Sequence, residues 1–240
     1  MNSPNKHYGV ARVISKRGFS SRSAAEKAVR EGRVMLNDRV VTDPETPAML
    51  NAKIYVDGIP VLTNEFAYYA FNKPRGIVTT ASDEKGRKTV MDFIAPLNLT
   101  HLSPVGRLDM ASEGLLLFTN DTAFANRILS PEGHLEKEYH VQVEGIPEES
   151  EIQKMEEGIV VPPRVFGDKP EMMKAKSAEI FRRNEKTAWL RIVLQEGKNR
   201  EIRRILENLG YEVRRLVRVR IGNLELGNLK PGELRKLENP

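Results

Sequence analysis

The chain contains the stretch Pro104-Val-Gly-Arg-Leu-Asp109-Met-Ala-Ser-Glu-Gly114-Leu-Leu-Leu-Phe-Thr-Asn-Asp121. Its apolar run, 115–118, is short and dense, as is typical of a buried strand. Directly before this run, Arg107 and Asp109 lie in a polar loop bracketed by glycines. A polar loop anchored to a core strand is a common way to present a reactive group. Taken alone, however, the stretch is explained more simply by a turn in which Asp109 bonds its own backbone.

Composition limits the classes of protein that the chain can represent. Its 240 residues suffice for one or two domains with a sizeable core. The absence of cysteine excludes disulfides, thiol chemistry and thiolate zinc sites, and the four histidines have no metal-ligand spacing. No apolar run has membrane-spanning length, and the N-terminus lacks the apolar core of a signal peptide. We therefore expect a cytoplasmic protein that binds neither a metal nor a membrane.

Positive charge is unevenly distributed along the chain. The formal net charge is +5, and residues 198–220 contain eight Lys or Arg against three Glu. A clustered excess of this kind indicates a polyanionic partner, most often nucleic acid. A well-solvated basic helix face is the alternative explanation.

Residues 8–60 are predicted to form a compact α/β module. Apolar residues at helical spacing predict one helix from Val10 that Gly18 ends, and a second over 22–31 with Ser20 or Ser21 as its cap. Short strands are expected at 34–36, 40–41 and 54–56. The two helices carry a row of basic residues suited to phosphate contacts that position RNA without reading its sequence. Those assigned to RNA are Lys16, Arg17 and Arg22.

This module resembles the small RNA-binding domain named after small-subunit ribosomal protein four. The matching residues are Gly18-Phe-Ser-Ser-Arg22-Ser-Ala-Ala-Glu26, Gly32-Arg-Val34, Leu36-Asn37 and Val56-Asp-Gly58. The chain departs from the family pattern at Asp38, where a turn glycine is usual, and it lacks the usual Arg-Leu-x-Lys at the start of the first helix.

Residues 66–240 are predicted to form a second, larger domain. Strands are expected at 66–71, 77–80, 115–118, 137–143, 175–181, 187–194, 216–219 and 224–226, and helices at 89–94, 122–129, 148–157 and 199–209. Because strands and helices do not alternate regularly, we predict an α+β fold rather than a doubly wound one.

Three separated blocks of the second domain resemble one enzyme family. They are Gly106-Arg-Leu-Asp109 with Ser112-Glu-Gly114-Leu-Leu-Leu, then Lys137-x-Tyr139-x-Val141, then Glu196-Gly-Lys-Asn-Arg200-Glu-Ile-Arg203-Arg. In this order, and behind the RNA-binding module, they are similar to the RsuA/RluB/RluE/RluF branch of the ribosomal pseudouridine synthases. The resemblance covers nearly the whole chain and implies a mixed, mainly antiparallel sheet in the catalytic domain.

The resemblance implies an isomerase that turns a uridine of ribosomal RNA into pseudouridine. The N-glycosidic bond breaks, the uracil turns, and its carbon 5 rejoins the ribose, so no cofactor or metal is implied. The resemblance makes Asp109 the essential carboxylate. Three roles stay open for it: attack on the ribose, addition to the uracil ring or abstraction of a ribose proton. Each role requires an ionised carboxylate that points at the substrate. Arg203 is implied to hold this carboxylate, although a solvated helix arginine is the simpler explanation of Arg203 alone.

Further residues are assigned around the base. Tyr139 matches the family tyrosine that packs against the target base, while its alternation on a strand suits the core equally well. Arg107 is expected either near the vacated stack or in contact with the RNA backbone, because chemistry on a base in structured RNA requires extruding it. Arg200 and Arg204 are assigned to RNA phosphates, and Leu206 to the lining of the pocket or to the core. The expected partner is ribosomal RNA or a pre-ribosomal particle, with large-subunit RNA weakly favoured by the Arg-rich segment 213–220, and the expected state is a monomer.

Two other functions fit parts of the pattern. One is a non-catalytic RNA-binding or ribosome-assembly factor with the same fold, which the three intact blocks disfavour. The other is a hydrolytic glycosidase that uses Asp109 with Glu113 or Asp121 as a carboxylate pair. The basic character of the chain favours RNA over a sugar polymer as substrate.

Overall fold

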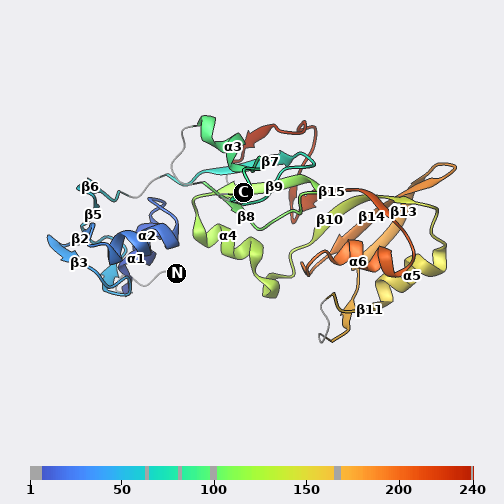
Figure 1. Ribbon diagram of the computed structural model, residues 1–240, viewed down its shortest axis with the longest axis horizontal. Helices are drawn as coiled ribbons and strands as arrows, with labels where there is room; N and C mark the ends of the chain where they lie inside the picture. Colours follow the sequence, from blue (N-terminus) through green and yellow to red (C-terminus); the bar gives the residue numbers. More distant parts are fainter. Residues whose placement is uncertain (1–6, 63–64, 81–82, 98–101, 165–168, 239) are drawn as a thin grey trace.

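The computed structural model describes residues 7–62, 65–80, 83–97, 102–164, 169–238 and 240. A small N-terminal part and a larger C-terminal part lie side by side along the long axis of the molecule (Figure 1). Residues 10–61 supply one hydrophobic core of their own, and the buried apolar residues from Ala70 onward form two others. The parts touch where helix α1 (Val10–Lys16) contacts helix α4 (Thr122–Leu129).

The N-terminal part contains two short helices, a four-stranded sheet and a separate strand pair. Its elements are β1 His7–Gly9, α1 Val10–Lys16, α2 Arg22–Arg30, β2 Val34–Leu36, β3 Arg39–Val41, β4 Pro47–Met49, β5 Ile54–Val56 and β6 Ile59–Pro60. The sheet has the order β3-β2-β5-β6, and β1 pairs with β4. Both predicted helices are confirmed, and the Ala24 N–H donates to the capping Ser21 hydroxyl. Asn37 and Asp38 both have positive φ in the β2–β3 turn, the left-handed conformation that a two-residue hairpin favours.

Arg17 does not lie on the RNA-facing surface that the sequence predicted for it. Its side chain is buried, with 7% of the residue exposed, and its guanidinium donates to the carbonyl oxygens of Leu50, Ala52 and Val61. Burial lowers its pKa. Arg17 therefore joins the end of α1 to two later loops, and its assignment to phosphate was wrong.

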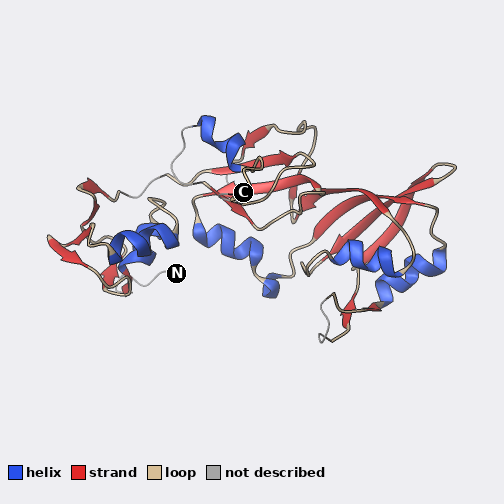
Figure 2. Cartoon of the chain, viewed as in Figure 1, coloured by secondary structure: helices blue, strands red, loops and turns tan. Residues whose placement is uncertain are grey.

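The larger part is organised around one sheet. Its strands are β7 Tyr68–Lys73, β8 Ser103–Val105, β9 Glu113–Thr119, β10 Lys137–Glu144, β11 Ile159–Val161, β12 Glu171–Met173, β13 Ser177–Arg183, β14 Thr187–Leu194, β15 Val213–Ile221, β16 Leu224–Glu225 and β17 Leu234–Lys236. Its helices are α3 Met91–Ile94, α4 Thr122–Leu129, α5 Glu149–Glu157 and α6 Glu201–Asn208, with short 3₁₀ turns at Ala95–Leu97 and Pro131–Gly133. Figure 2 shows the strands gathered into a layer with helices packed against it.

The main sheet has the order β13-β14-β10-β15-β9-β7-β17, with β16 added to β15 and β8 to β9. All its pairings are antiparallel except that of β15 with β9. The predicted α+β class and mainly antiparallel sheet are confirmed. The strand expected at 77–80 was wrong, because this segment forms only an isolated bridge from Val78 to Thr89.

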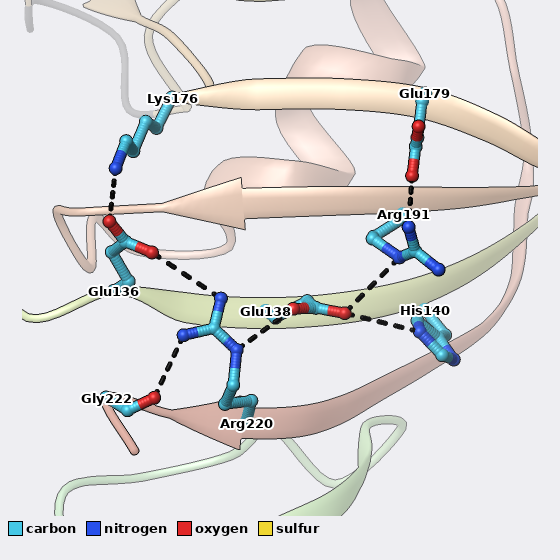
Figure 3. A network of polar contacts seen from close by, with 8 residues as sticks. All are labelled: Glu136, Glu138, His140, Lys176, Glu179, Arg191, Arg220 and Gly222. Atoms are coloured by element: carbon cyan, nitrogen blue, oxygen red, sulfur yellow. Dashed lines mark hydrogen bonds and ion pairs between the residues drawn. The ribbon is translucent and has the colours of Figure 1, made fainter. Parts of the chain in front are cut away.

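Strand β10 separates a buried face of the sheet from a polar one. Tyr139, Val141 and Val143 lie in the main core, which includes residues of α5 and α6. The alternate residues Glu138 and His140 belong to a network of ion pairs on the outer face (Figure 3). We call this face the outer face of the sheet.

Gly114 permits the one parallel pairing. Its φ is +100°, and a Cβ at this position would lie 2.2 Å from the carbonyl oxygen of Arg218. Only glycine therefore lets β9 approach β15 at this point, directly after the loop that carries Asp109.

Candidate active site

A cleft of about 720 Å³ lies in the larger part, between the loop before β9, the end of α4, the start of β10 and the segment 194–203. Five residues that the sequence assigned to the site line it although they are far apart in the chain: Arg107, Asp109, Tyr139, Arg200 and Arg203. All five come from the three separated sequence blocks that resemble the enzyme family. The fold thus brings the separated blocks together at one place.

The loop that carries Asp109 is held through its backbone. The Leu108 N–H donates to the Thr79 hydroxyl, which in turn donates to the Leu108 carbonyl oxygen at 2.7 Å. The Ser112 N–H donates to the Asp109 carbonyl oxygen, and the Gly76 N–H donates to that of Met110. The backbone conformation at Asp109 is therefore fixed from both sides, by residues that lie about 30 positions earlier in the chain and by the loop itself.

Two buried cations complete the support of this loop. Arg203 donates through Nη2 to the Ala111 carbonyl oxygen at 3.1 Å and through Nη1 to that of Val213 at 3.3 Å. Lys73, the last residue of β7, is fully buried and donates through Nζ to the carbonyl oxygens of Ser112 at 2.7 Å and Pro74 at 3.1 Å. Both side chains place positive charge close behind Asp109.

Burial shifts the pKa of both cations downward. Desolvation lowers the pKa of Lys73 from 10.5 to about 8, an effect that the nearby carboxylates of Glu113 and Asp109 oppose. Desolvation, followed by repulsion from Arg200, lowers the pKa of Arg203, and attraction to Asp109 opposes this. The hydrogen bonds that these two side chains donate go to carbonyl oxygens and not to a carboxylate, and Arg203 Nε is buried without a hydrogen-bond partner among the described residues.

The direct ion pair of Asp109 is formed by Arg200 and not by Arg203. Arg200 Nη1 lies 3.6 Å from Asp109 Oδ2, and the Asp109 side chain remains 38% exposed to the cleft. Arg200 has φ +52°, a left-handed conformation that is uncommon outside glycine and that directs the chain into α6. The sequence had assigned Arg200 to phosphate and the contact with Asp109 to Arg203. In the structure, Arg200 and not Arg203 forms the ion pair with Asp109.

Tyr139 serves the core and the cleft at once. It is only 8% exposed and belongs to the main hydrophobic core, yet it also lines the cleft. Its register partners are Ile192 on β14 and Arg218 on β15. The ring is therefore fixed on both sides by neighbouring strands before any ligand enters.

One further assignment, that of Arg204 to RNA phosphate, was wrong. Leu206 takes the second of its two predicted places: it is fully buried in the main core and does not line the cleft. Arg204 is also buried, where it donates to the Glu171 carboxylate at 2.9 Å and to the Pro162 carbonyl oxygen at 3.2 Å. It thereby attaches α6 to the β11–β12 pair instead of offering its charge to RNA.

The remaining basic residues keep their assignment as predictions. Arg107 is exposed at the cleft. In the N-terminal part, Arg22 is exposed and forms ion pairs with Glu26 and Glu45, and the Lys16 ammonium lies 4.8 Å from the centre of the Tyr8 ring.

The carboxylate pair of a glycosidase does not form. Glu113 pairs with Arg215, at 2.8 Å, and Asp121 accepts hydrogen bonds from the Tyr68 hydroxyl and the first N–H groups of α4. Neither residue lines the cleft with Asp109.

Among the described residues, no group of three His, Asp or Glu could hold a metal ion. None of the helices within the described residues is long and apolar enough to cross a membrane.

Sequence reasoning missed Lys73 and Thr79. The signal for Lys73 was a charged residue that ends an aromatic-rich strand and precedes Pro74. Thr79 gave no signal, because a threonine in a predicted strand is ordinary.

Known proteins resemble the chain over nearly its full length. The model of the family described as RNA pseudouridylate synthase matches residues 67–208, and the S4 domain model matches residues 10–48. A Bacillus subtilis protein named ribosomal large subunit pseudouridine synthase B is 37% identical, over 95% of this chain and 91% of its own. A Rickettsia felis protein, named only as an uncharacterized RNA pseudouridine synthase, is 35% identical over 96% of both chains. A crystal structure described as a pseudouridylate synthase superposes with a TM-score of 0.65 at 29% identity and covers 96% of each chain.

Thr79→Val is expected to destabilise the protein. The change removes the hydroxyl that bonds both backbone groups of the buried Leu108, at nearly constant volume. We expect the free energy of unfolding to fall by about 1–3 kcal/mol, measured by urea denaturation. Thr79→Ser keeps the hydroxyl and is expected to lose less; equal losses in both variants would contradict the role of this hydrogen bond.

Lys73 predicts a specific pH dependence of stability. Folded Lys73 releases its proton near pH 8, whereas the unfolded chain holds it until about 10.5, so unfolding takes up a proton between these values. The free energy of unfolding should therefore rise with pH across this window more steeply in the wild type than in Lys73→Met. Parallel pH profiles of the two proteins in urea titrations would show that Lys73 keeps an ordinary pKa.

Proposed function

The chain belongs to the RNA pseudouridylate synthase family, and from this we infer that it isomerises a uridine of ribosomal RNA to pseudouridine, with Asp109 as the essential carboxylate. The observation that carries the proposal is the convergence of Asp109, Tyr139 and Arg203 on one cleft of a chain that matches the family.

Ribosomal RNA is the proposed substrate class, and large-subunit RNA the proposed target. The S4 domain match and the basic residues of α1 and α2 support an RNA partner. The name of the Bacillus subtilis relative supports a large-subunit target, as does the Arg-rich strand β15. We propose that residues 8–60 bind RNA and that residues 66–240 carry the reaction, with Lys16, Arg22 and Arg107 contacting the backbone.

Asp109 is suited to this role by how it is held. Its loop is fixed through consecutive carbonyl oxygens, while its carboxylate stays partly open to the cleft and beside Arg200. Positive charge near a carboxylate favours its ionised form. Attack on the ribose, addition to the uracil and abstraction of a ribose proton all need an ionised carboxylate that cannot turn away, and the supported loop meets that need.

Tyr139 and Arg203 are assigned different tasks. Tyr139 would pack its ring against the extruded uracil, because its position is set by strands on both sides. Extrusion requires a few kcal/mol of unstacking and unpairing energy, which such contacts offset. Arg203 would hold the loop through Ala111 and add positive potential behind Asp109, and Arg200 would hold the carboxylate itself.

Asp109→Asn tests the proposal. The amide is nearly isosteric and leaves the backbone contacts of the loop in place, so binding of an unmodified ribosomal RNA transcript should persist. Pseudouridine formation should fall by at least about a hundredfold, measured by primer extension across carbodiimide adducts.

Glu113→Gln is the matched control, because it removes a neighbouring carboxylate that does not line the cleft. It should retain product formation within a few-fold. Retained pseudouridine in Asp109→Asn would contradict the catalytic assignment. A wild-type protein that binds the transcript without forming product would instead support the non-catalytic RNA-binding factor, and release of free uracil would support a glycosidase.

A further inference from the structure

One wall of the cleft carries three charged residues that the proposed reaction has not used. Lys137 precedes Tyr139 by two residues on β10, so the two share a face of the strand, and Arg218 on β15 is the register partner of Tyr139. Glu201, the first residue of α6, lines the same cleft. We call Lys137, Glu201 and Arg218 the polar wall.

Arg218 is buried, and its guanidinium has a hydrogen-bond donor without a partner among the described residues. It is 5% exposed, and its Nε donates to the Leu115 carbonyl oxygen at 2.8 Å. Its Nη2 is buried and has no hydrogen-bond partner among the described residues, and no ion pair within that part of the chain engages the guanidinium. A buried guanidinium donor without a partner is destabilising, and such groups in native structures are usually completed by a ligand or a water.

Lys137 and Glu201 are also incompletely paired. Lys137 donates to the Leu135 carbonyl oxygen at 3.1 Å, and its pKa is lowered by burial first and then by Arg218. Glu201 is 3% exposed, accepts a hydrogen bond from the Lys198 N–H at 3.2 Å, and has a pKa raised mainly by burial. Attraction to Glu201 acts on Lys137, yet no direct ion pair joins the carboxylate to either cation of the wall in the described structure.

We propose that the polar wall recognises the Watson–Crick edge of the extruded uracil, an inference that rests on the proposed function. That edge presents two carbonyl oxygens on either side of the N3–H group. Lys137 and Arg218 donate to the carbonyl oxygens, and Glu201 accepts from N3–H. A base that packs on Tyr139 brings its edge to Lys137 and Arg218, the neighbouring residues on the same face of the sheet. Glu201 lines the same cleft from the start of α6.

This arrangement discriminates against cytosine. Cytosine replaces one carbonyl oxygen by an amino group and the N3–H by a lone pair. Its amino donor would meet a cation, and its N3 lone pair would meet the Glu201 carboxylate. A site built to bond a particular donor and acceptor rejects analogues strongly, because its own buried polar groups are then left unpaired.

A phosphate is a poorer occupant of the wall. A carboxylate beside a phosphate repels it, and Glu201 is fixed in place by its bond to the Lys198 N–H. Arg107 lies exposed at the same cleft and suits the RNA backbone better. The donor and acceptor content of the wall therefore favours a base edge.

Variants of the cations provide the first test. Their substrate is a synthetic RNA that carries the unmodified target uridine, once that position has been mapped. Lys137→Met and Arg218→Met should each lower kcat/KM for pseudouridine formation by roughly 10- to 100-fold. Arg220→Met is the matched control, because Arg220 lies two residues further on β15 and pairs with Glu136 and Glu138 on the outer face (Figure 3). It should stay within about threefold of the wild type.

A substrate change gives a second test that does not depend on how well a variant folds. Replacing the target uridine by 3-methyluridine removes the N3–H donor without blocking carbon 5 or the glycosidic bond. The wild type should convert this RNA at least roughly tenfold less efficiently, with both C-glycosides quantified by mass spectrometry of the digested RNA. Glu201→Ala should lose most of this preference, so that the two substrates react at similar rates.

The outcomes separate the two proposals. A wild type that forms pseudouridine but converts uridine and 3-methyluridine equally well overturns the polar wall and leaves the proposed function standing. A second outcome also overturns the polar wall. If kcat/KM falls in Lys137→Met and Arg218→Met but Glu201→Ala still prefers uridine to 3-methyluridine, the two cations contact a phosphate instead. A wild type that forms no pseudouridine in any ribosomal RNA transcript overturns the proposed function itself.

Discussion

Five consecutive carbonyl oxygens, from Leu108 to Ser112, each accept a hydrogen bond, and the position of Asp109 depends on them. Their donors are the Thr79 hydroxyl, the N–H groups of Ser112 and Gly76, the Arg203 guanidinium and the Lys73 ammonium. These donors come from β7, the segment after it, the loop itself and α6. A loop that is held in this way cannot relax when its carboxylate is desolvated, which is the condition that catalysis on an extruded base requires.

The rest of the larger part places these donors. Strand β9 continues directly from the loop and pairs with β7, whose last residue is Lys73, and with β15. Gly114 allows the approach to β15, which brings Arg218 beside Tyr139. Helix α6 packs on the buried face of the sheet, the face that carries Tyr139, and its Arg203 bonds the Asp109 loop. The buried cations are thus the points at which distant segments meet, and each compensates its desolvation by bonding carbonyl oxygens.

The sequence predicted the helices α1, α2, α4, α5 and α6 closely, because each has a clear apolar period and a cap or stop residue. It missed the short strands β1, β4, β6, β8, β11, β12 and β17, which lack the alternation that longer strands show. The Asp109 loop, Tyr139 and Arg203 were found through motifs in separate blocks.

The partners of individual arginines could not be predicted, because burial depends on segments that pack from elsewhere in the chain. Arg17 is covered by loops 33 to 44 residues later, and Arg204 by the β11–β12 pair. Arg200 and Arg203 lie three residues apart, and Arg200, whose backbone is left-handed, reaches the Asp109 carboxylate while Arg203 reaches the Ala111 carbonyl oxygen. Thr79 and Lys73 act through backbone atoms of another segment, a contact that no local pattern records.

A map of pseudouridine in ribosomal RNA tests the central claim most directly. RNA would be compared between cells that carry this gene, cells that lack it, and cells in which it is restored as wild type or as Asp109→Asn. We expect a discrete position in large-subunit RNA to lose its carbodiimide stop in cells without the gene and to regain it only with the wild type. An unchanged map, or a site restored by Asp109→Asn, would contradict the central claim.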